Sequence, residues 1–231
     1  MTVTAERELV LVGAGGFGRE TAEAVRALNA TGERWRLAGY LDDEPAHHGT
    51  VIDGVPVLGA IDELDNMPDV SVVVCTGRPD NYVSRPGIVE RLGLPPERYA
   101  TIIHPSASVS CTSRVGPGSV LLAQTVLTAA VVVGSHVAIM PHVILTHDDV
   151  IGDFATIASG VCLGGNVLVG RCVYIGAGAL LREQCSIGSG ALVGMGAVVT
   201  RDIPPGEVWA GVPARHIRKA DAATASLGAG N

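Results

Sequence analysis

The sequence contains a row of aliphatic residues that recur every six positions. Seventeen consecutive positions at this spacing, from Ile103 to Val199, hold only Leu, Ile or Val, and no insertion interrupts them. A period of six fits neither the 3.6-residue period of a helix nor the two-residue alternation of a flat strand. It is typical of a repeat architecture in which each unit turns one corner and directs one aliphatic side chain inward.

A second row lies four residues after each aliphatic position and consists of small or β-branched residues, as a tight corner requires. Its one charged member is Asp149, which follows His147 and Asp148. If three six-residue units close one triangular coil, positions one coil apart stack, and the row makes roughly five to six coils of a β-helix. A charge that interrupts a regular pattern indicates a functional site at this corner.

Composition and charge exclude several classes of protein. Of the 231 residues 47% are hydrophobic but only 3% aromatic, so the core must consist of aliphatic layers. A formal net charge of −7 argues against nucleic-acid binding. The polar start and the absence of a long apolar stretch argue against a signal peptide and a membrane span. Five cysteines, an odd number without CxxC spacing, indicate buried free thiols in a reducing cytoplasm.

Residues 1–100 have a different pattern, in which short apolar runs alternate with helix-like stretches. This alternation predicts a small parallel α/β sheet. The six-residue period begins near residue 101 and ends at the prolines after residue 203, which predicts a β-helix over 101–203. A C-terminal segment is expected over 204–219 and a disordered tail over 220–231. The expected strands are 8–12, 36–41, 55–58, 70–75 and 99–103, and the expected helices are a stretch from Gly18 to about Leu28, 60–66 and 80–92.

A glycine-rich loop follows the first expected strand. Gly13, Gly15 and Gly18 fit the GxGxxG pattern, and Asp42 and Asp43 follow about 25 residues later. Such a loop lets backbone N–H groups approach a pyrophosphate at a helix N-terminus. Three interpretations remain: a nucleotide-sugar diphosphate site, a purely structural loop, and an NAD site. The NAD interpretation is the weakest, because the rest of the chain offers no domain for hydride transfer.

His147 is the strongest candidate for a catalytic residue. It lies two positions after the inward Leu145, so its side chain is expected to point outward at a corner. An amine or alcohol that attacks a thioester must lose a proton, and an imidazole can accept it near neutral pH. Asp148 or Asp149 could orient the ring. The alternative is a solvated surface histidine without a catalytic role.

The chain resembles the NeuD/PglD-like sugar O- and N-acetyltransferases, a branch of the left-handed β-helix hexapeptide acyltransferases. Besides the hexapeptide row, the motifs that carry the resemblance are Gly13–Gly18, Leu41-Asp42-Asp43, Gly54–Gly59, His104-Pro-Ser, Thr146-His147-Asp148, Gly165-Asn166-Val167 and Gly211–Arg215. The resemblance implies an N-terminal Rossmann-like domain for a nucleotide-linked sugar. It also implies a homotrimer with acetyl-CoA between neighbouring β-helices.

The resemblance assigns roles to individual residues. It implies that His147 is the general base and favours Asp148, the residue directly after it, as the group that orients the ring. The residues implied to bind the sugar nucleotide are Gly15, Gly16, Phe17, Asp42, Asp43 and Gly77. The residues implied to contact acetyl-CoA are Thr156, Ala177 and Met195. Thr156 stands where relatives commonly carry a second histidine, which threonine cannot replace as a proton carrier.

Spacing bears on two further candidate sites. Gly165 stacks one full coil after His147, so its N–H is a candidate donor to the oxyanion of the reacting thioester, or simply a corner glycine. A zinc site at His142 and His147 is disfavoured, because Gln124 and Ser106 stack under His142 and neither is a good zinc ligand. His136 is expected on a face of the prism, at a contact between subunits.

Together these observations predict an α/β Rossmann-like domain followed by an all-β left-handed parallel β-helix. The predicted activity is acetyl-CoA-dependent N-acetylation of a nucleotide-linked amino sugar, by direct transfer and without a metal. The alternatives are sugar O-acetylation, of the sialic acid or polysaccharide type, and a non-catalytic protein that binds sugar nucleotides. The expected location is the cytoplasm.

Overall fold

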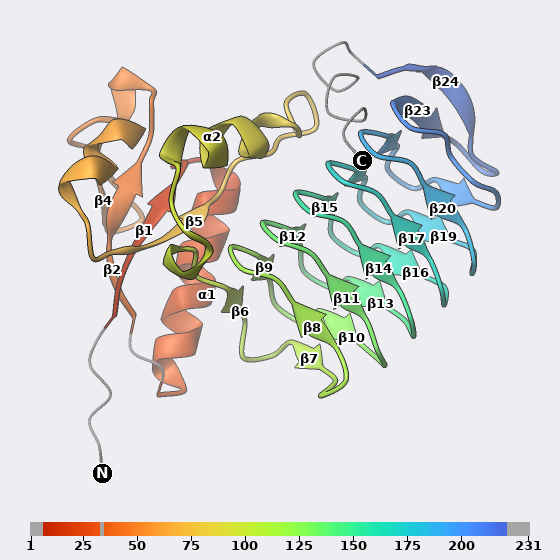
Figure 1. Ribbon diagram of the computed structural model, residues 1–231, viewed down its shortest axis with the longest axis horizontal. Helices are drawn as coiled ribbons and strands as arrows, with labels where there is room; N and C mark the ends of the chain where they lie inside the picture. Colours follow the sequence, from red (N-terminus) through yellow and green to blue (C-terminus); the bar gives the residue numbers. More distant parts are fainter. Residues whose placement is uncertain (1–6, 33–34, 221–231) are drawn as a thin grey trace.

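The computed structural model describes residues 7–32 and 35–220 (Figure 1). Its first part contains a five-stranded sheet with the order β3-β4-β2-β1-β5. In this sheet β1, β2, β4 and β5 run parallel, whereas β3 pairs antiparallel with β4. The elements are β1 (Arg7–Val12), α1 (Gly16–Ala30), β2 (Trp35–Leu41), η1 (Pro45–His47), β3 (Val51–Ile52), β4 (Val55–Gly59), η2 (Ile61–Asn66), β5 (Ser71–Val74), α2 (Ser84–Leu92) and η3 (Pro96–Arg98).

The expected strand over 99–103 is wrong as a single element. Tyr99 forms only an isolated parallel bridge with Val72. The strand β6 (Ile102–Ile103) instead pairs with β9 (Val120–Leu121) and begins the repeat. The apolar run over 99–103 therefore contributes to both halves of the molecule and does not form one strand.

Helix α1 joins the N-terminal sheet to the repeat. Its buried positions include Gly18, Ala22 and Val25, spaced three or four residues apart as one face of a helix requires. The apolar cluster around α1 continues through Ile102 and Val120. In Figure 1 this helix accordingly lies between β1 and the first coils of the repeat.

The repeat is a triangular prism of three parallel sheets. Strands three hexapeptide units apart pair in register, as with Ala138, Thr156 and Tyr174. The first face consists of β6, β9, β12 (Ala138–Ile139), β15 (Thr156–Ile157), β18 (Tyr174–Ile175) and β21 (Leu192–Val193). The second face consists of β7 (Ser108–Val109), β10 (Val126–Leu127), β13 (Ile144–Leu145), β16 (Cys162–Leu163), β19 (Leu180–Leu181) and β22 (Val198–Val199). The third face consists of β8 (Arg114–Val115), β11 (Val132–Val133), β14 (Val150–Ile151), β17 (Leu168–Val169) and β20 (Ser186–Ile187).

The hexapeptide row forms the core of this prism, as predicted. From Leu121 to Val199 every member of the row is buried, and Ile103, Val109 and Val115 at the open end are partly buried. Burial of each such side chain stabilises the fold by about 1.5–3 kcal/mol. The second row is also buried from Ser119 onward, and its charged member Asp149 is fully buried.

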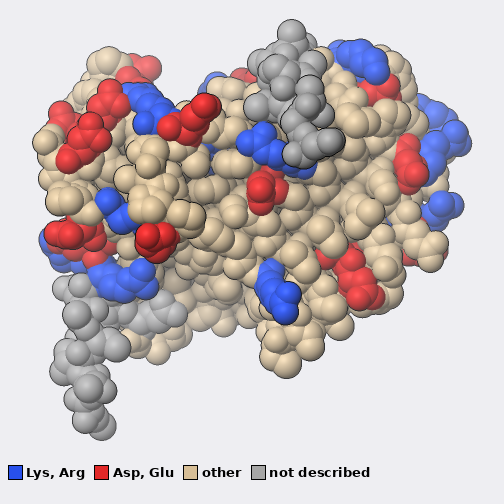
Figure 2. All heavy atoms as spheres, viewed as in Figure 1, with Lys and Arg blue, Asp and Glu red and all other residues tan. Residues whose placement is uncertain are grey.

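A short hairpin follows the last coil. β23 (Glu207–Ala210) pairs parallel with β21, and β24 (Arg215–Lys219) pairs antiparallel with β23. All five residues of β24 are exposed, and Figure 2 shows basic side chains gathered at this end of the molecule. Of the predicted tail 220–231, only Ala220 lies within the described residues, and its N–H donates to the carbonyl of Gly206.

Candidate active site

A cavity of about 630 Å³ lies between the N-terminal sheet and the first face of the prism. All six residues predicted to bind a sugar nucleotide border it: Gly15, Gly16, Phe17, Asp42, Asp43 and Gly77. The opposite wall comes from the prism and consists of Met140, Thr156, Ala158 and Tyr174. The cavity therefore requires the contact between the two halves of the chain.

The glycines of the loop have two different physical roles. A Cβ on Gly18 would lie 2.1 Å from the carbonyl oxygen of Gly13, so Gly18 allows α1 to approach the loop. Gly13 itself has φ of +103°, which side chains disfavour. Gly15 and Gly16, in contrast, have no atom within 4 Å of a Cβ. These two glycines leave the N-terminus of α1 open to an anionic ligand.

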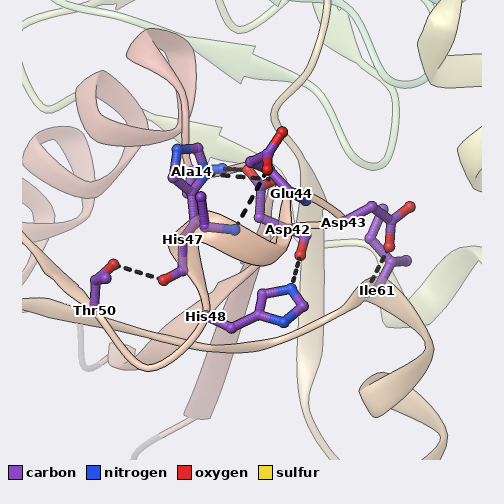
Figure 3. A network of polar contacts seen from close by, with 9 residues as sticks. Ala14, Asp42, Asp43, Glu44, His47, His48, Thr50 and Ile61 are labelled. Atoms are coloured by element: carbon purple, nitrogen blue, oxygen red, sulfur yellow. Dashed lines mark hydrogen bonds and ion pairs between the residues drawn. The ribbon is translucent and has the colours of Figure 1, made fainter.

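The carboxylates of Asp42 and Asp43 are engaged with their surroundings (Figure 3). Asp42 accepts hydrogen bonds from the N–H groups of Ala14 at 2.7 Å and Glu44 at 2.9 Å. Asp43 accepts from the Ile61 N–H and pairs with Arg91 at 2.6 Å. Burial raises the pKa of Asp43, but the hydrogen bonds from Arg91 and Ile61 outweigh it and lower the pKa. Both carboxylates thus hold the loop segments that shape the cavity.

His147 lies outward at the corner between the second and third faces, which we call the His147 corner (residues 146–149 and their equivalents one coil away). Its Nδ1 lies 2.8 Å from the Asp148 carboxylate, and both side chains are more than half exposed. A Cβ on Gly165 would lie 2.3 Å from Nε2 of His147, so the imidazole rests directly against this glycine. Within the described part of the chain, the Gly165 N–H has no hydrogen-bond acceptor.

Asp149 has a different role from Asp148. Its carboxylate is fully buried and accepts hydrogen bonds from the N–H groups of Thr146 and Val167, both at 2.8 Å. Burial raises its pKa to about 6, although the hydrogen bonds from Val167 and Thr146 oppose this shift. The two acidic residues after His147 therefore make different contacts. Asp148 contacts the imidazole, whereas Asp149 connects the His147 corner to the next coil through its hydrogen bonds.

The raised pKa of Asp149 predicts a pH-dependent stability. Between about pH 4 and pH 6 the native state keeps a proton that the unfolded chain releases, so stability falls as the pH rises through this window. Relative to Asp149→Asn, the wild-type protein should lose up to about 3 kcal/mol of unfolding free energy between pH 4 and pH 7. Urea unfolding of both proteins across this range measures the difference. A difference that does not change with pH would contradict the prediction.

The residues predicted to contact acetyl-CoA do not meet in one chain. Thr156 comes half a coil after His147 and lies buried on the first face beside the cavity. Ala177 and Met195 stack with each other at the corner between the first and second faces, and Met195 is 81% exposed. Only Gly165 lies beside His147, because only its spacing is a whole coil.

Two residues have surroundings that sequence reasoning missed. The expectation that His136 lies at a contact between subunits is wrong, because its ring is buried within the chain between Tyr99 and Phe154. Burial, with the nearby charge of Arg85, lowers the pKa of His136 to about 4, so this histidine is neutral. Arg85 is itself fully buried under the cavity, and no spacing in the sequence indicated it.

Neither a metal-binding cluster nor a membrane-spanning helix occurs in the described part of the chain. Among residues 7–32 and 35–220, no group of three His, Cys, Asp or Glu side chains is arranged to hold a metal ion. In the same ranges, no helix combines the length and the apolar character needed to span a bilayer.

Known proteins resemble this chain in both of its halves. Residues 8–91 match the family model described as the PglD N-terminal domain. The chain is 36% identical over 121 residues to the UDP-N-acetylbacillosamine N-acetyltransferase of Bacillus subtilis (strain 168). This match covers 51% of the chain and 52% of that protein, so the chain spans about half the length of the curated relative that it matches.

Solved structures match almost the whole chain. The acetyltransferase domain of PglB from Neisseria gonorrhoeae FA1090, in complex with acetyl coenzyme A, is 32% identical with a TM-score of 0.80. The match covers 92% of this chain and 100% of that one. A variant of GDP-perosamine N-acetyltransferase from Caulobacter crescentus, in complex with CoA and GDP-perosamine, is 27% identical with a TM-score of 0.79. That match covers 92% of this chain and 98% of the other.

A Rossmann-like domain seated on a prism of hexapeptide coils, with these neighbours, defines a left-handed β-helix acyltransferase. Within this class, the chain belongs to the NeuD/PglD-like family of acetyl-CoA-dependent sugar acetyltransferases. The fold class and the family predicted from the sequence are therefore confirmed.

Proposed function

We propose that this protein transfers the acetyl group of acetyl-CoA to the amino group of a nucleotide-linked amino sugar. One observation carries the proposal. The chain combines a cavity that contains an open helix N-terminus with a second site, in which His147 contacts Asp148 and rests against Gly165. Two of the relatives named above, the Bacillus subtilis and Caulobacter crescentus N-acetyltransferases, are named for a UDP- and a GDP-linked sugar, which supports an amine acceptor of the same kind.

The chemistry follows from the His147 corner. Nδ1 of His147 contacts Asp148, so Nε2 is the nitrogen that accepts the proton of the attacking amine. The Asp148 carboxylate stabilises the imidazolium that forms. The N–H of Gly165 donates to the negative charge that develops on the carbonyl oxygen of the thioester. The amine nitrogen bonds directly to the thioester carbon, the C–S bond breaks, and the leaving sulfur of CoA takes the proton from His147, so CoA leaves as the thiol and no acyl-enzyme forms.

The direct test is turnover with defined acceptors. Acetyl-CoA is incubated with UDP-N-acetylbacillosamine or GDP-perosamine, and the released thiol and the mass of the product are measured. An amide product resists hydroxylamine, whereas an ester is cleaved by it. An ester product would favour O-acetylation, and absence of thiol release with both acceptors would favour a non-catalytic binding protein.

The same proposal includes a homotrimer whose active sites lie between subunits. Within one chain, the cavity adjoins the first face of the prism, but His147 lies at the opposite corner. A sugar held in the cavity therefore needs His147 from a neighbouring subunit. A closed ring of identical subunits satisfies this requirement for every site.

The faces beside the His147 corner support such a contact. On the third face, Val132, Val150 and Leu168 stack in successive coils and are 40–51% exposed. On the second face, Ile144 and Leu180 are similarly exposed. Burying these aliphatic side chains against a second copy of the chain is favourable.

Acetyl-CoA would then lie in the groove between two prisms, beside Ala177 and Met195. Three exposed cations of β24, Arg215, Arg218 and Lys219, lie near the end of this groove in a chain whose net charge is −7. Cations of this kind suit the phosphates of CoA. We also infer a cytoplasmic location, since all five cysteines are free thiols.

A substitution at Gly16 separates the two substrates. A Val side chain at this position would enter open space in the cavity and block the approach of a phosphate to the N-terminus of α1. Gly16→Val should raise the Michaelis constant for the sugar nucleotide by about tenfold or more and leave that for acetyl-CoA unchanged.

Gly87→Val is the matched control for Gly16→Val. Gly87 also has open space around its Cβ, but it lies on α2 and does not border the cavity. Steady-state kinetics with each substrate varied in turn measures both constants. If Gly16→Val instead raised the Michaelis constant for acetyl-CoA, the proposal that the N-terminal half binds the sugar nucleotide would be contradicted.

A further inference from the structure

Arg85 is a fully buried cation that joins the two halves of the chain. It lies in the first turn of α2 and is 1% exposed. Its Nη1 donates to the carbonyl oxygen of Thr76 at 2.5 Å. Its Nη2 donates to the carbonyl oxygens of Phe154 and Ala155 and to the hydroxyl oxygen of Thr156, the last at 2.7 Å.

The charge of Arg85 has no acidic partner among the described residues. Burial lowers its pKa to about 10, and the groups that oppose this shift are the thiols of Cys172 and Cys75. The guanidinium therefore remains charged at neutral pH, and its Nε has no hydrogen-bond partner in the described chain. A buried charge without a counter-ion is costly for folding, so its presence under a cavity indicates a function.

The guanidinium determines how the Thr156 hydroxyl can act. This hydroxyl oxygen accepts a hydrogen bond from a cation, so its single proton is left to be donated elsewhere. Thr156 borders the cavity, and in the first face it pairs with Tyr174, which also borders the cavity. Gly77 covers the other side of the guanidinium, since a Cβ there would lie 2.3 Å from Nη1.

The surroundings of Thr156 define the ligand group that it meets. Met140 and Ala158 make the adjoining wall apolar, whereas Gly15 and Gly16 at the other end leave α1 open for phosphates. The end of the cavity formed by the prism therefore suits a group of mixed polarity, with an oxygen acceptor beside an apolar patch. The sugar portion of a nucleotide-linked sugar is such a group.

We propose that Arg85 is a positioning residue that fixes the Thr156 hydroxyl as a hydrogen-bond donor into the cavity, where it selects a sugar with an oxygen acceptor at that end. This inference rests on the proposed function. In this proposal the Thr156 hydroxyl, positioned by Arg85, binds the sugar, whereas the glycine-rich loop binds the diphosphate.

Calorimetric titration tests the proposal by comparing each sugar nucleotide with its bare nucleotide. The pairs are UDP-N-acetylbacillosamine with UDP, and GDP-perosamine with GDP. Thr156→Val should weaken binding of the sugar nucleotide that the wild type accepts by about tenfold or more and change binding of the bare nucleotide by less than about twofold. Thr156→Ser, which keeps the hydroxyl, should bind like the wild type.

Arg85→Lys completes the series. A lysine keeps the charge but cannot bridge the Thr76 carbonyl and the Thr156 hydroxyl, so it should weaken sugar-nucleotide binding in the same selective way. In turnover assays the Michaelis constant for the sugar nucleotide should rise while that for acetyl-CoA stays constant. Thr125→Val is the matched control, because Thr125 is buried, its hydroxyl donates to the Leu122 carbonyl at 2.9 Å, and it does not border the cavity.

The outcomes separate this inference from the proposed function. Equal losses for sugar nucleotide and bare nucleotide, or no loss in Thr156→Val, would overturn the role of the Arg85–Thr156 pair. If Arg85→Lys strongly lowers the melting temperature, its binding data do not report on the sugar contact. The comparison of Thr156→Val with Thr156→Ser then tests the role of the hydroxyl. A wild-type protein that binds the sugar nucleotide but does not acetylate it would overturn the proposed function alone. Failure to bind any sugar nucleotide would overturn both.

Discussion

Replacing His147 with alanine should lower the turnover rate by about 10²–10⁴-fold, the usual contribution of a general base. The reason is the position of the imidazole, which contacts Asp148 through Nδ1 and rests against Gly165 near Nε2. Affinity for acetyl-CoA should change little, because the proton acceptor acts in the transition state rather than in binding. Single-turnover kinetics and CoA titration measure the two effects separately.

His142→Ala is the matched control for this substitution. His142 is also an exposed histidine outside the core, and it lies at another corner of the same coil. It borders neither Gly165 nor the cavity. His142→Ala should keep the activity of the wild type. Near-normal turnover in His147→Ala would rule out His147 as the base.

Two impaired variants should restore activity to each other when they are expressed together. His147→Ala destroys the base but keeps the cavity, whereas Gly16→Val blocks the cavity but keeps the base. If each site combines the cavity of one subunit with His147 of its neighbour, random mixing in a ring leaves about a quarter of the sites intact. Turnover at low sugar-nucleotide concentration should therefore rise to about a quarter of the wild-type rate, from about a tenth or less for either variant alone.

The controls for this experiment follow from the same geometry. Co-expression of His147→Ala with His147→Gln damages the same half of every site and should give no recovery. Leu168→Glu places a charge on the third face beside the His147 corner, where the side chain is 51% exposed, and should separate the subunits and abolish the recovery. Absence of recovery in the first mixture would mean that cavity and base act within one chain.

The arrangement around His147 could be predicted from spacing alone. The row of aliphatic residues places Leu145 inside the prism, so a residue two positions later, at the corner, is free to face outward. Gly165 follows one full coil later, and the structure accordingly brings it against the imidazole. The resemblance favoured Asp148 over Asp149 as the residue that orients the ring, and in the structure Asp148 contacts the imidazole whereas Asp149 is buried.

The surroundings of Thr156 could not be predicted in the same way. Its match to a histidine of relatives suggested a contact with acetyl-CoA and gave no indication that its hydroxyl accepts a hydrogen bond from Arg85, 71 residues earlier in the chain. Nothing periodic connects α2 with the first face of the prism. The prediction of a single strand over 99–103 was wrong for a related reason. One end of this apolar run pairs with Val72 of the N-terminal sheet, and the other end pairs with β9 of the prism.

Local repetition was thus sufficient for the β-helix and its core, because a side chain's direction within a coil depends only on its place in the six-residue unit. The family required further motifs as well, among them Gly13–Gly18 and Thr146-His147-Asp148. The cavity, the burial of His136 and the unpaired charge of Arg85 arise where the N-terminal domain docks on the prism. That docking brings together residues far apart in the chain, and it depends on the summed shape and burial of two surfaces, which no short pattern in the sequence encodes.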